Sequence, residues 1–308
     1  LRRAPERIRE RSHLIASSEH RELLAATLER FERSTAPWLD DLRSGVIHND
    51  INDHNVLTGD LAITDGWPER HVTGLIDLGD AMNGWVVTDL AIAIAYAILG
   101  CDDVLEVSLS ITAGYNEVLP LEKAEISALF GLIALRLALS VAISAEQSAE
   151  EPDNDYLTVS GTPAWVALAR LAAINPNLAS YHLRAACRLP ASPAGATLSS
   201  WLESTDLQFA NVIDSPLAGA DVHVFDLGVG STEMGIGAPG DFVTAELSDM
   251  LFGQMRAAEK TVGLGRYNEV RSWYGGELFA TPSNEAPCRR TVHVGVDVFL
   301  ESGEIGRA

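Results

Sequence analysis

The sequence feature that most constrains the fold is a long apolar run from Ala128 to Ser144, with one charged residue, Arg136, near its centre. A helix without a polar face packs inside a protein or a membrane. The run is shorter than the ~20 residues that usually cross a bilayer. We therefore expect a buried helix, from Glu122 to about Ala149, inside a globular domain.

Short strands precede this helix, and further helices flank it. Val46–Leu57 has the pattern of a strand, a loop and a second strand, and Val72–Asp77 forms another short strand. Asn55–Leu57 and Leu75–Asp77 can pair as a small ribbon. From Asp89 to Cys187 the pattern is helical throughout. The chain is therefore predicted to be of the α+β class.

The pattern changes after Cys187, where a stretch rich in Pro, Ala and Ser begins. Beyond it lie a Gly-rich loop, Gly228–Gly240, and short strand-like runs at Val222–Phe225 and Val292–Leu300. We predict a mostly helical domain over residues 1–187, a linker over 188–210, and an incomplete β-rich domain over 211–308.

Composition limits the partners of this chain. The formal net charge is -21, and such an acidic chain repels phosphate backbones and anionic headgroups. We expect no nucleic-acid partner and no membrane partner. The three cysteines, Cys101, Cys187 and Cys288, are too few and too far apart for a disulfide framework. A reducing, cytoplasmic location fits them best.

The most informative motif is His48-x-Asp50-x-x-x-x-Asn55, between apolar strand residues. Phosphoryl transfer to an alcohol needs an acceptor for the hydroxyl proton and oxygen ligands for Mg²⁺. Asp50 is placed for the first role, and Asn55 can return to the same site as a ligand. Asp77, after the strand Gly74–Ile76, is the expected acidic partner. Either motif alone would be an ordinary polar turn, but the ordered pair favours a catalytic site.

These motifs resemble those of the aminoglycoside-phosphotransferase/choline-kinase superfamily, and the region around Tyr115 and Pro120–Glu125 resembles its hydroxylysine-kinase branch. The resemblance covers roughly residues 10–187 and implies a protein-kinase-like C-lobe. It implies a small hydroxyl substrate, with an amino alcohol such as hydroxylysine as the expected type, and Mg²⁺ with ATP or GTP. By that resemblance Asp50 is the catalytic base, His48 braces the loop, and Asn55 and Asp77 are the magnesium ligands. Asp80 is implied to face the substrate, and Asp89 to buttress the loop from within.

The chain departs from that family in one respect. No strand-borne Lys and no Gly-rich loop precede His48, so the family's N-terminal lobe is not in this sequence. The first residue is not Met. We expect the chain to be part of a longer protein and to bind nucleotide poorly in isolation.

A second motif, His293-x-x-x-Asp297, lies in an alternating strand-like run. Residues four apart on a strand share a face, so both side chains can ligate one metal. The motif resembles the entry strand of lysostaphin-like metallopeptidases, which implies Zn²⁺ at these two residues. A zinc hydrolase is therefore the alternative function, although a structural role for His293 on a half-buried strand is equally compatible with the pattern.

The two resemblances, in this order, are similar to fused proteins in which a kinase-like and a peptidase-like domain precede a class-III aminotransferase domain. That arrangement implies a downstream aminotransferase-like partner domain with pyridoxal phosphate, beyond Ala308. A third alternative is a non-catalytic scaffold, in which the kinase fold only organises its neighbours.

Overall fold

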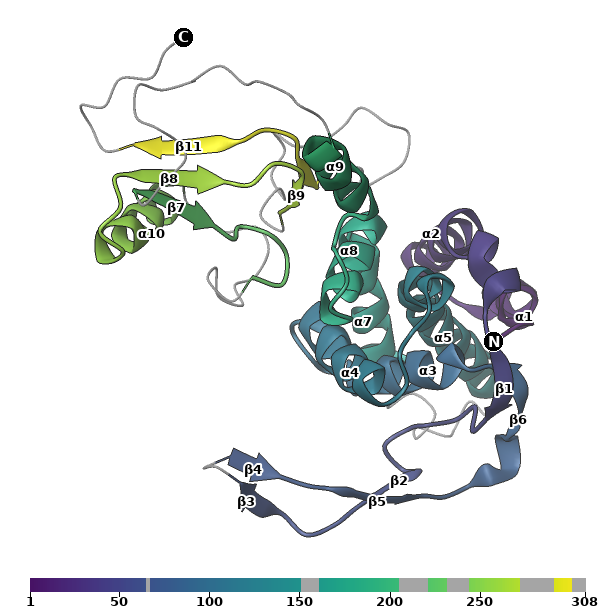
Figure 1. Ribbon diagram of the computed structural model, residues 1–308. Helices are drawn as coiled ribbons and strands as arrows, with labels where there is room; N and C mark the ends of the chain where they lie inside the picture. Colours follow the sequence, from purple (N-terminus) through teal and green to yellow (C-terminus); the bar gives the residue numbers. More distant parts are fainter. Residues whose placement is uncertain (65–66, 151–160, 205–220, 232–243, 272–290, 301–308) are drawn as a thin grey trace. The chain divides into compact units, whose positions relative to one another are not determined.

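The computed structural model describes residues 1–64, 67–150, 161–204, 221–231, 244–271 and 291–300. The chain divides into two compact units, Leu1–Ser180 and Tyr181–Ala308. The division lies inside a helix, before the boundary expected at residue 187. Within the first unit, helices form the bulk and paired strands form an arm (Figure 1).

The first unit is built from six helices described in full and three short 3-10 turns. The helices are α1 (Ala4–Arg11), α2 (Ser18–Ser34), α3 (Val87–Ala97), α4 (Val104–Val118), α5 (Lys123–Glu150) and α7 (Gly161–Ala173), with the 3-10 turns η1 (Ser12–Leu14), η2 (Ala36–Asp41) and η3 (Leu78–Asp80). Helix α8 (Pro176–Ala186) spans the division between the units.

Helix α5 is the centre of the first unit, packing against α1, α2, α3 and α7. Leu132, Ile133 and Leu135 are all at 0% exposure. Successive helical residues are about 100° apart, so these three side chains point in different directions. Because all three are buried, the helix is covered by protein on each of these sides. By length and composition α5 could cross a membrane, but 72% of its apolar window is buried inside the protein. The prediction of a buried helix is confirmed.

A charge pair ties the start of α5 to the strand that leads into the motif. Glu125 is at 0% exposure. Its carboxylate accepts hydrogen bonds from Arg43 Nε at 2.9 Å and Arg43 Nη2 at 2.5 Å, and from the backbone N–H of Glu122 at 2.8 Å. A buried carboxylate is tolerated when its oxygens are satisfied in this way.

The strands of the first unit form three antiparallel pairs. Their bounds are β1 (Ser44–Ile47), β2 (Val56–Thr58), β3 (Ala62–Thr64), β4 (Trp67–Glu69), β5 (Val72–Leu75) and β6 (Met82–Trp85). Strand β1 pairs with β6, β2 with β5 and β3 with β4. The expected ribbon is confirmed, since Val56 lies opposite Leu75 and Leu57 opposite Gly74.

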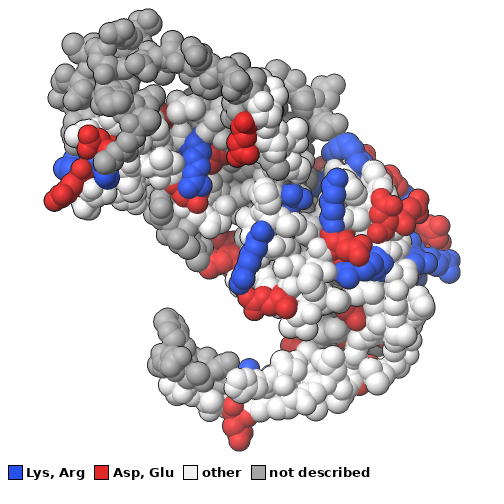
Figure 2. Space-filling view, in the orientation of Figure 1, with Lys and Arg blue, Asp and Glu red and all other residues white. Residues whose placement is uncertain are grey.

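The β2–β5 ribbon projects from the helices and carries β3–β4 at its far end (Figure 1). Ile63 on β3 is 69% exposed, and Val72 and Leu75 on β5 are 64% and 48% exposed. In the view of Figure 2 its surface is mostly uncharged. A two-stranded ribbon cannot enclose a core of its own, which accounts for these exposed apolar side chains.

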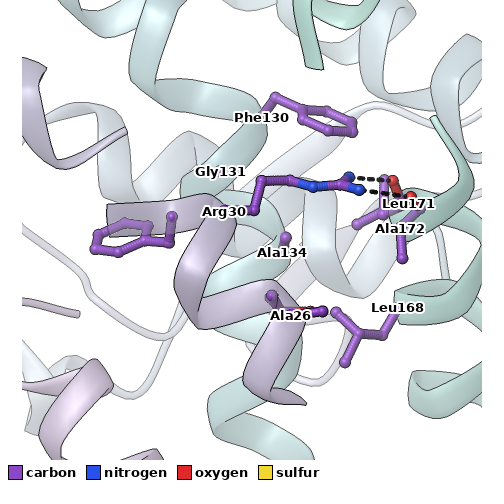
Figure 3. A pocket seen from close by; sticks show the side chains of 10 residues that line it. Ala26, Arg30, Phe130, Gly131, Ala134, Leu168, Leu171 and Ala172 are labelled. Carbon is purple, nitrogen blue, oxygen red and sulfur yellow. Dashed lines mark hydrogen bonds between the residues drawn. The ribbon is translucent and has the colours of Figure 1, made fainter. Parts of the chain in front are cut away.

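Arg30 of α2 joins α2 to the end of α7 (Figure 3). Its guanidinium donates to the carbonyl oxygens of Leu171 at 3.3 Å, Ala172 at 2.8 Å and Ile174 at 3.2 Å. The last carbonyls of a helix have no partner within it, and a cation there also complements the helix dipole. Burial lowers the pKa of Arg30, and Arg33 lowers it further. The adjoining cavity of about 30 Å³ holds little more than a water molecule.

The described part of the second unit is mixed rather than β-rich. It contains α9 (Pro193–Ser204), α10 (Thr244–Ala257), β7 (Val222–Phe225), β8 (Val262–Gly265), β9 (Glu269–Val270), β10 (Val292–His293) and β11 (Asp297–Leu300). Strands β11, β8 and β7 form one sheet, in which β7 and β8 are parallel and α10 lies between them in sequence. Strands β9 and β10 form a separate pair.

The difference from the expected β-rich domain has a local cause. Phe225, Leu227, Leu251 and Met255 form a buried cluster, and Leu247 packs against it. Leu247, Leu251 and Met255 recur every fourth residue, which is a helical period that the Gly-rich neighbourhood obscures. Helix α9 likewise occupies much of the expected linker at 188–210. Most of the Gly-rich loop Gly228–Gly240 lies outside the described residues.

We predict that Gly131→Ala on α5 destabilises the first unit. A Cβ there would lie 1.9 Å from Thr35 Oγ1 and 2.9 Å from Thr35 Cβ. Thr35 is buried and follows α2 directly, so relieving the clash must shift packed elements. We expect a loss of about 1–3 kcal/mol in the free energy of unfolding, measured by urea denaturation.

The matched control is Gly114→Ala on α4, where nothing lies within 4 Å of the added Cβ. Helix propensity alone then favours Ala, by up to about 1 kcal/mol. Equal stability of the two variants would contradict the packing argument.

Candidate active site

The loop that follows β1 is held in place by Asp89 at the start of α3. One Asp89 carboxylate oxygen accepts from the backbone N–H of His48 at 2.8 Å, and the other from that of Asn49 at 2.7 Å. Asn49 has a φ of 67°, a left-handed conformation that Asn tolerates better than most residues. Asp89 thus buttresses the motif loop from within, as the resemblance implies.

Asp50 comes next in the loop, and both of its carboxylate oxygens have partners. Its Oδ2 accepts from Asn52 Nδ2 at 2.9 Å and from Asn55 Nδ2 at 3.3 Å. Its Oδ1 accepts from Arg136 Nη2 at 3.3 Å. The Asp50 side chain is still 26% exposed, so the carboxylate is oriented by the protein and remains accessible.

Asn55 closes the loop and begins the ribbon. Its Nδ2 donates to Asp50 O at 2.9 Å as well as to Asp50 Oδ2, so its amide nitrogen faces Asp50. The Asn55 side chain is buried, at 7% exposure. Because the nitrogen is used for Asp50, the amide oxygen is the atom left for a metal.

Asp77 lies at the same end of the ribbon as Asn55. The backbone N–H of Ile76 donates to Asn55 O at 3.0 Å, directly after the Val56–Leu75 pair. Asp77 follows in a left-handed conformation, with φ 62° and ψ 66°, and its Oδ1 accepts from Gly79 N at 3.4 Å. Its side chain is exposed. The ribbon register thus brings the two predicted magnesium ligands to one end of one element.

The donor set suits Mg²⁺. One amide oxygen and one carboxylate are hard oxygen ligands, and Mg²⁺ usually takes one or two carboxylates and completes its shell with water and phosphate oxygens. Among the residues that the structure describes, no three His, Cys, Asp or Glu side chains gather closely enough to form a metal cage. Asn55 and Asp77 therefore fit a metal shared with phosphate better than a permanently enclosed ion.

His48 connects the two halves of the site. Its Nε2 lies 2.9 Å from Ile76 O. A carbonyl oxygen only accepts, so Nε2 carries the hydrogen. His48 Nδ1 is buried and has no hydrogen-bond partner among the described residues. The ring braces the motif loop against the strand that leads to Asp77, which is the role that the resemblance implies.

The remaining candidates lie on the surface of the site. Asp80 ends η3 and is exposed. Asp53 and His54 form an exposed pair, 3.9 Å apart. None of these three side chains is fixed by packing, so a role for Asp80 toward substrate stays a prediction. Three cavities lie along α2, near Arg30 and near Leu24.

Sequence reasoning did not assign roles to Arg136, Tyr96 and Asn52, which also belong to the site. Arg136 Nη2 donates to Tyr96 OH at 2.6 Å in addition to Asp50. The signal for Arg136 was its position as a lone charge in an apolar helix. Asn52 lies within the motif, but its type is ordinary in a turn and gave no signal.

The second predicted metal pair lies in the second unit. His293 Nε2 is 3.4 Å from Asp297 Oδ1, so the two side chains do come together. Asp297 Oδ2, however, is 2.6 Å from Arg271 Nη1. Burial lowers the pKa of His293, with Arg271 adding to the effect and Asp297 opposing it. A guanidinium beside the carboxylate is an unfavourable neighbour for a zinc ion.

Comparison with known proteins supports the interpretation of the motifs around Asp50 and Asp77. Residues 1–116 match the model of the phosphotransferase enzyme family. Hydroxylysine kinase of Mus musculus is 30% identical over 158 residues, which are 51% of this chain and 42% of that protein. Hydroxylysine kinases of Xenopus laevis and Danio rerio are 28% and 27% identical over 160 residues each, covering 51% and 52% of this chain and 43% and 44% of those proteins.

This chain therefore spans less than half the length of the curated relatives it matches. The matched family segment contains Asp50, Asn55, Asp77 and Asp89, and ends before Arg136. The matches support a small-molecule phosphotransferase and a kinase-like first unit.

We predict that Asp89→Asn destabilises the motif loop. The substituted amide has one accepting oxygen, and its NH₂ would face one of the two backbone N–H groups that Asp89 now satisfies. Leaving a partly buried donor without its acceptor costs about 1–3 kcal/mol. Thermal and urea denaturation should show this loss, and hydrogen exchange at His48 and Asn49 should accelerate.

Asp53→Asn is the matched control, because the Asp53 side chain is 80% exposed. Its effect should stay within about 0.5 kcal/mol. Unchanged exchange at His48 in the Asp89 variant would show that Asp89 does not hold the loop.

Proposed function

We propose that the site around Asp50 transfers the γ-phosphoryl group of ATP or GTP to the hydroxyl group of a small molecule. The observation that carries the proposal is the grouping of an oriented, accessible carboxylate with two hard oxygen ligands at the end of one ribbon. The match of residues 1–116 to the phosphotransferase enzyme family supports the same reaction class.

Asp50 is the group proposed to accept the proton. The attacking hydroxyl would donate a hydrogen bond to Asp50, which orients its oxygen toward the phosphorus and takes up the proton as the bond to phosphorus forms. Orientation matters more than basicity in this class of reaction, since the transition state is loose. The hydrogen bonds from Asn52, Asn55 and Arg136 fit that requirement.

Asn55 and Asp77 are the residues that would hold Mg²⁺. When bound, the ion would neutralise negative charge on the nucleotide phosphates. Two features of the chain support this assignment: Asp50 fixes the direction of the Asn55 amide, and the β2–β5 register brings Asp77 to the same end of the ribbon.

An amino alcohol is the proposed acceptor, with hydroxylysine as the first candidate. Exposed carboxylates at Asp53 and Asp80 would favour a cationic amine near the site. The relatives that this chain matches are named as hydroxylysine kinases. Because the chain spans less than half of those relatives, activity is best sought in the full natural protein that carries it.

We predict that Asp50→Asn in the full natural protein lowers kcat for the acceptor by roughly 10²- to 10⁴-fold, the usual contribution of a positioned general base. Binding of magnesium nucleotide should persist, because Asp50 is not one of the proposed ligands. Coupled measurement of nucleoside diphosphate release tests the first expectation, and isothermal titration with Mg-ATP tests the second.

Asp60→Asn, which changes an exposed carboxylate on the ribbon, is the control. Full turnover in the Asp50 variant would refute the assignment.

We predict that Asp77→Asn raises the Mg²⁺ concentration needed for half-maximal rate by roughly 10-fold or more, since a neutral ligand binds a hard cation less well. A magnesium titration at fixed acceptor measures this. Asp80→Asn, three residues further along, should leave the magnesium requirement unchanged and alter KM for a cationic acceptor. An unchanged requirement in the Asp77 variant would remove Asp77 from the metal site.

The other sequence-based hypotheses stay predictions. Zinc at His293 and Asp297 would have to displace Arg271 from Asp297, which disfavours the zinc hydrolase. A downstream aminotransferase-like domain with pyridoxal phosphate, and a scaffold role, would concern the longer protein. We place the proposed reaction in the cytoplasm, where ATP is abundant and where widely separated thiols stay reduced.

A further inference from the structure

Arg136 occupies an unusual position for a charged residue. It projects from the middle of α5, in a run of apolar residues, and its side chain is only 14% exposed. Its Nη2 contacts Asp50 Oδ1 at 3.3 Å and Tyr96 OH at 2.6 Å. Its Nε is buried and has no hydrogen-bond partner among the described residues.

The apolar packing of α5 gives no reason for a charge at this position. Removing a guanidinium from water costs several kcal/mol unless a partner compensates. The apolar neighbours Leu132, Ile133 and Leu135 pack α5 without any polar contact. The charged partner that Arg136 finds is Asp50, 86 residues earlier in the chain. The contact with Asp50 therefore explains an Arg at this position better than the packing of α5 does.

Tyr96 completes the arrangement from α3. The Arg136 guanidinium carbon lies 5.2 Å from the Tyr96 ring centroid, within cation–π distance. Burial raises the pKa of Tyr96, Arg136 opposes the rise, and the charge of Asp50 and a hydrogen bond to it add to the rise. The Tyr96 hydroxyl oxygen accepts from Arg136, and the charge of Asp50 acts on the same hydroxyl group. Three elements, α3, α5 and the motif loop, meet at one carboxylate.

We propose that Arg136, supported by Tyr96, is a positioning residue that fixes the Asp50 carboxylate for proton acceptance. Arg136 holds Oδ1 from the core side, while Asn52 and Asn55 hold Oδ2 from the loop side. Rotation of the carboxylate about its Cβ–Cγ bond would break contacts on both sides. The inference rests on the phosphotransferase function proposed above and adds a residue that lies outside the motif.

A competing role is recognition of an acceptor carboxylate, since Arg binds carboxylates in a bidentate manner. The geometry favours positioning, because Nη2 already donates to Asp50 and to Tyr96. The two roles differ in what they change. A positioning residue affects kcat for every acceptor, whereas a recognition residue affects KM for acceptors that carry a carboxylate.

The test compares Arg136→Met, Arg136→Lys and Tyr96→Phe in the full natural protein. Arg136→Met should lower kcat by roughly 10- to 100-fold, the effect expected from misplacing a reacting group by about 1 Å, with KM for nucleotide changed little. Arg136→Lys should recover part of the loss, and Tyr96→Phe should show a smaller one. Arg170→Met is the matched control, since Arg170 also pairs with a carboxylate, Asp102 at 2.8 Å, and lies outside the site.

Each variant is measured with hydroxylysine and with its decarboxylated amino-alcohol analogue. The proposal expects the same fractional loss of kcat with both acceptors. A rise in KM confined to hydroxylysine would overturn positioning in favour of recognition. Added guanidinium ion should restore part of the kcat of Arg136→Ala, and a merely structural defect would not respond.

A double-mutant cycle of Arg136→Met and Asp50→Asn, followed by urea denaturation, needs no activity. If the two side chains interact, the change in urea midpoint of the double variant should differ from the sum of the changes in the two single variants. Additive changes would overturn the contact itself. If the unaltered protein turned over no alcohol, the proposed function would fail and the cycle alone would decide whether Arg136 holds Asp50. Full turnover in Arg136→Met by an active protein would overturn only the positioning role.

Discussion

The first unit depends on the complete enclosure of α5. The helix has no polar face, so α1, α2, α3 and α7 must pack around it before its apolar side chains leave water. Two of its charged residues, Glu125 and Arg136, each bind the part of the unit that carries the motif loop. Glu125 holds Arg43 directly before β1, and Arg136 holds Asp50 just after β1 ends. The strand that leads into the motif loop and the first part of that loop are therefore both tied to the same buried helix. An adjustment of α5 would be transmitted to Asp50 through these two pairs.

Much of this site was predictable because its parts are close in sequence and follow local rules. The motif His48–Asn55 closes on itself through hydrogen bonds between Asp50, Asn52 and Asn55. The β2–β5 pairing follows from alternating strand residues, and it brings Asp77 to Asn55 once the register is set. The position of Asp89 followed from the resemblance rather than from any local rule. The roles of Asp50, Asn55 and Asp77 in catalysis remain expectations that the geometry accommodates.

Other features depend on tertiary packing and left little trace in the sequence. The contact of Arg136 with Asp50 joins residues 86 positions apart, and no local pattern pairs a helix centre with a loop. Gly131 looks unfavourable within a helix until Thr35 is seen against it. In the second unit, α10 was not predicted because a Gly-rich stretch precedes it in the sequence. Helix α9 was not predicted because it begins at a Pro in a stretch with the composition of a linker. Arg271 beside Asp297 changes the chemistry of a pair that looked like metal ligands when only their spacing was known.

The site is divided into a fixed half and an adaptable half, and this division bears on how such a protein can evolve. His48 and Asn55 are buried, and the Asp89 carboxylate holds two backbone groups, so most substitutions there would carry a folding penalty. Asp53, His54 and Asp80 are exposed and are not held by the core. Mutations at these surface positions can accumulate with little loss of stability. A lineage could thereby change the rim of this site by neutral drift, while the buried residues that hold its loop stay unchanged.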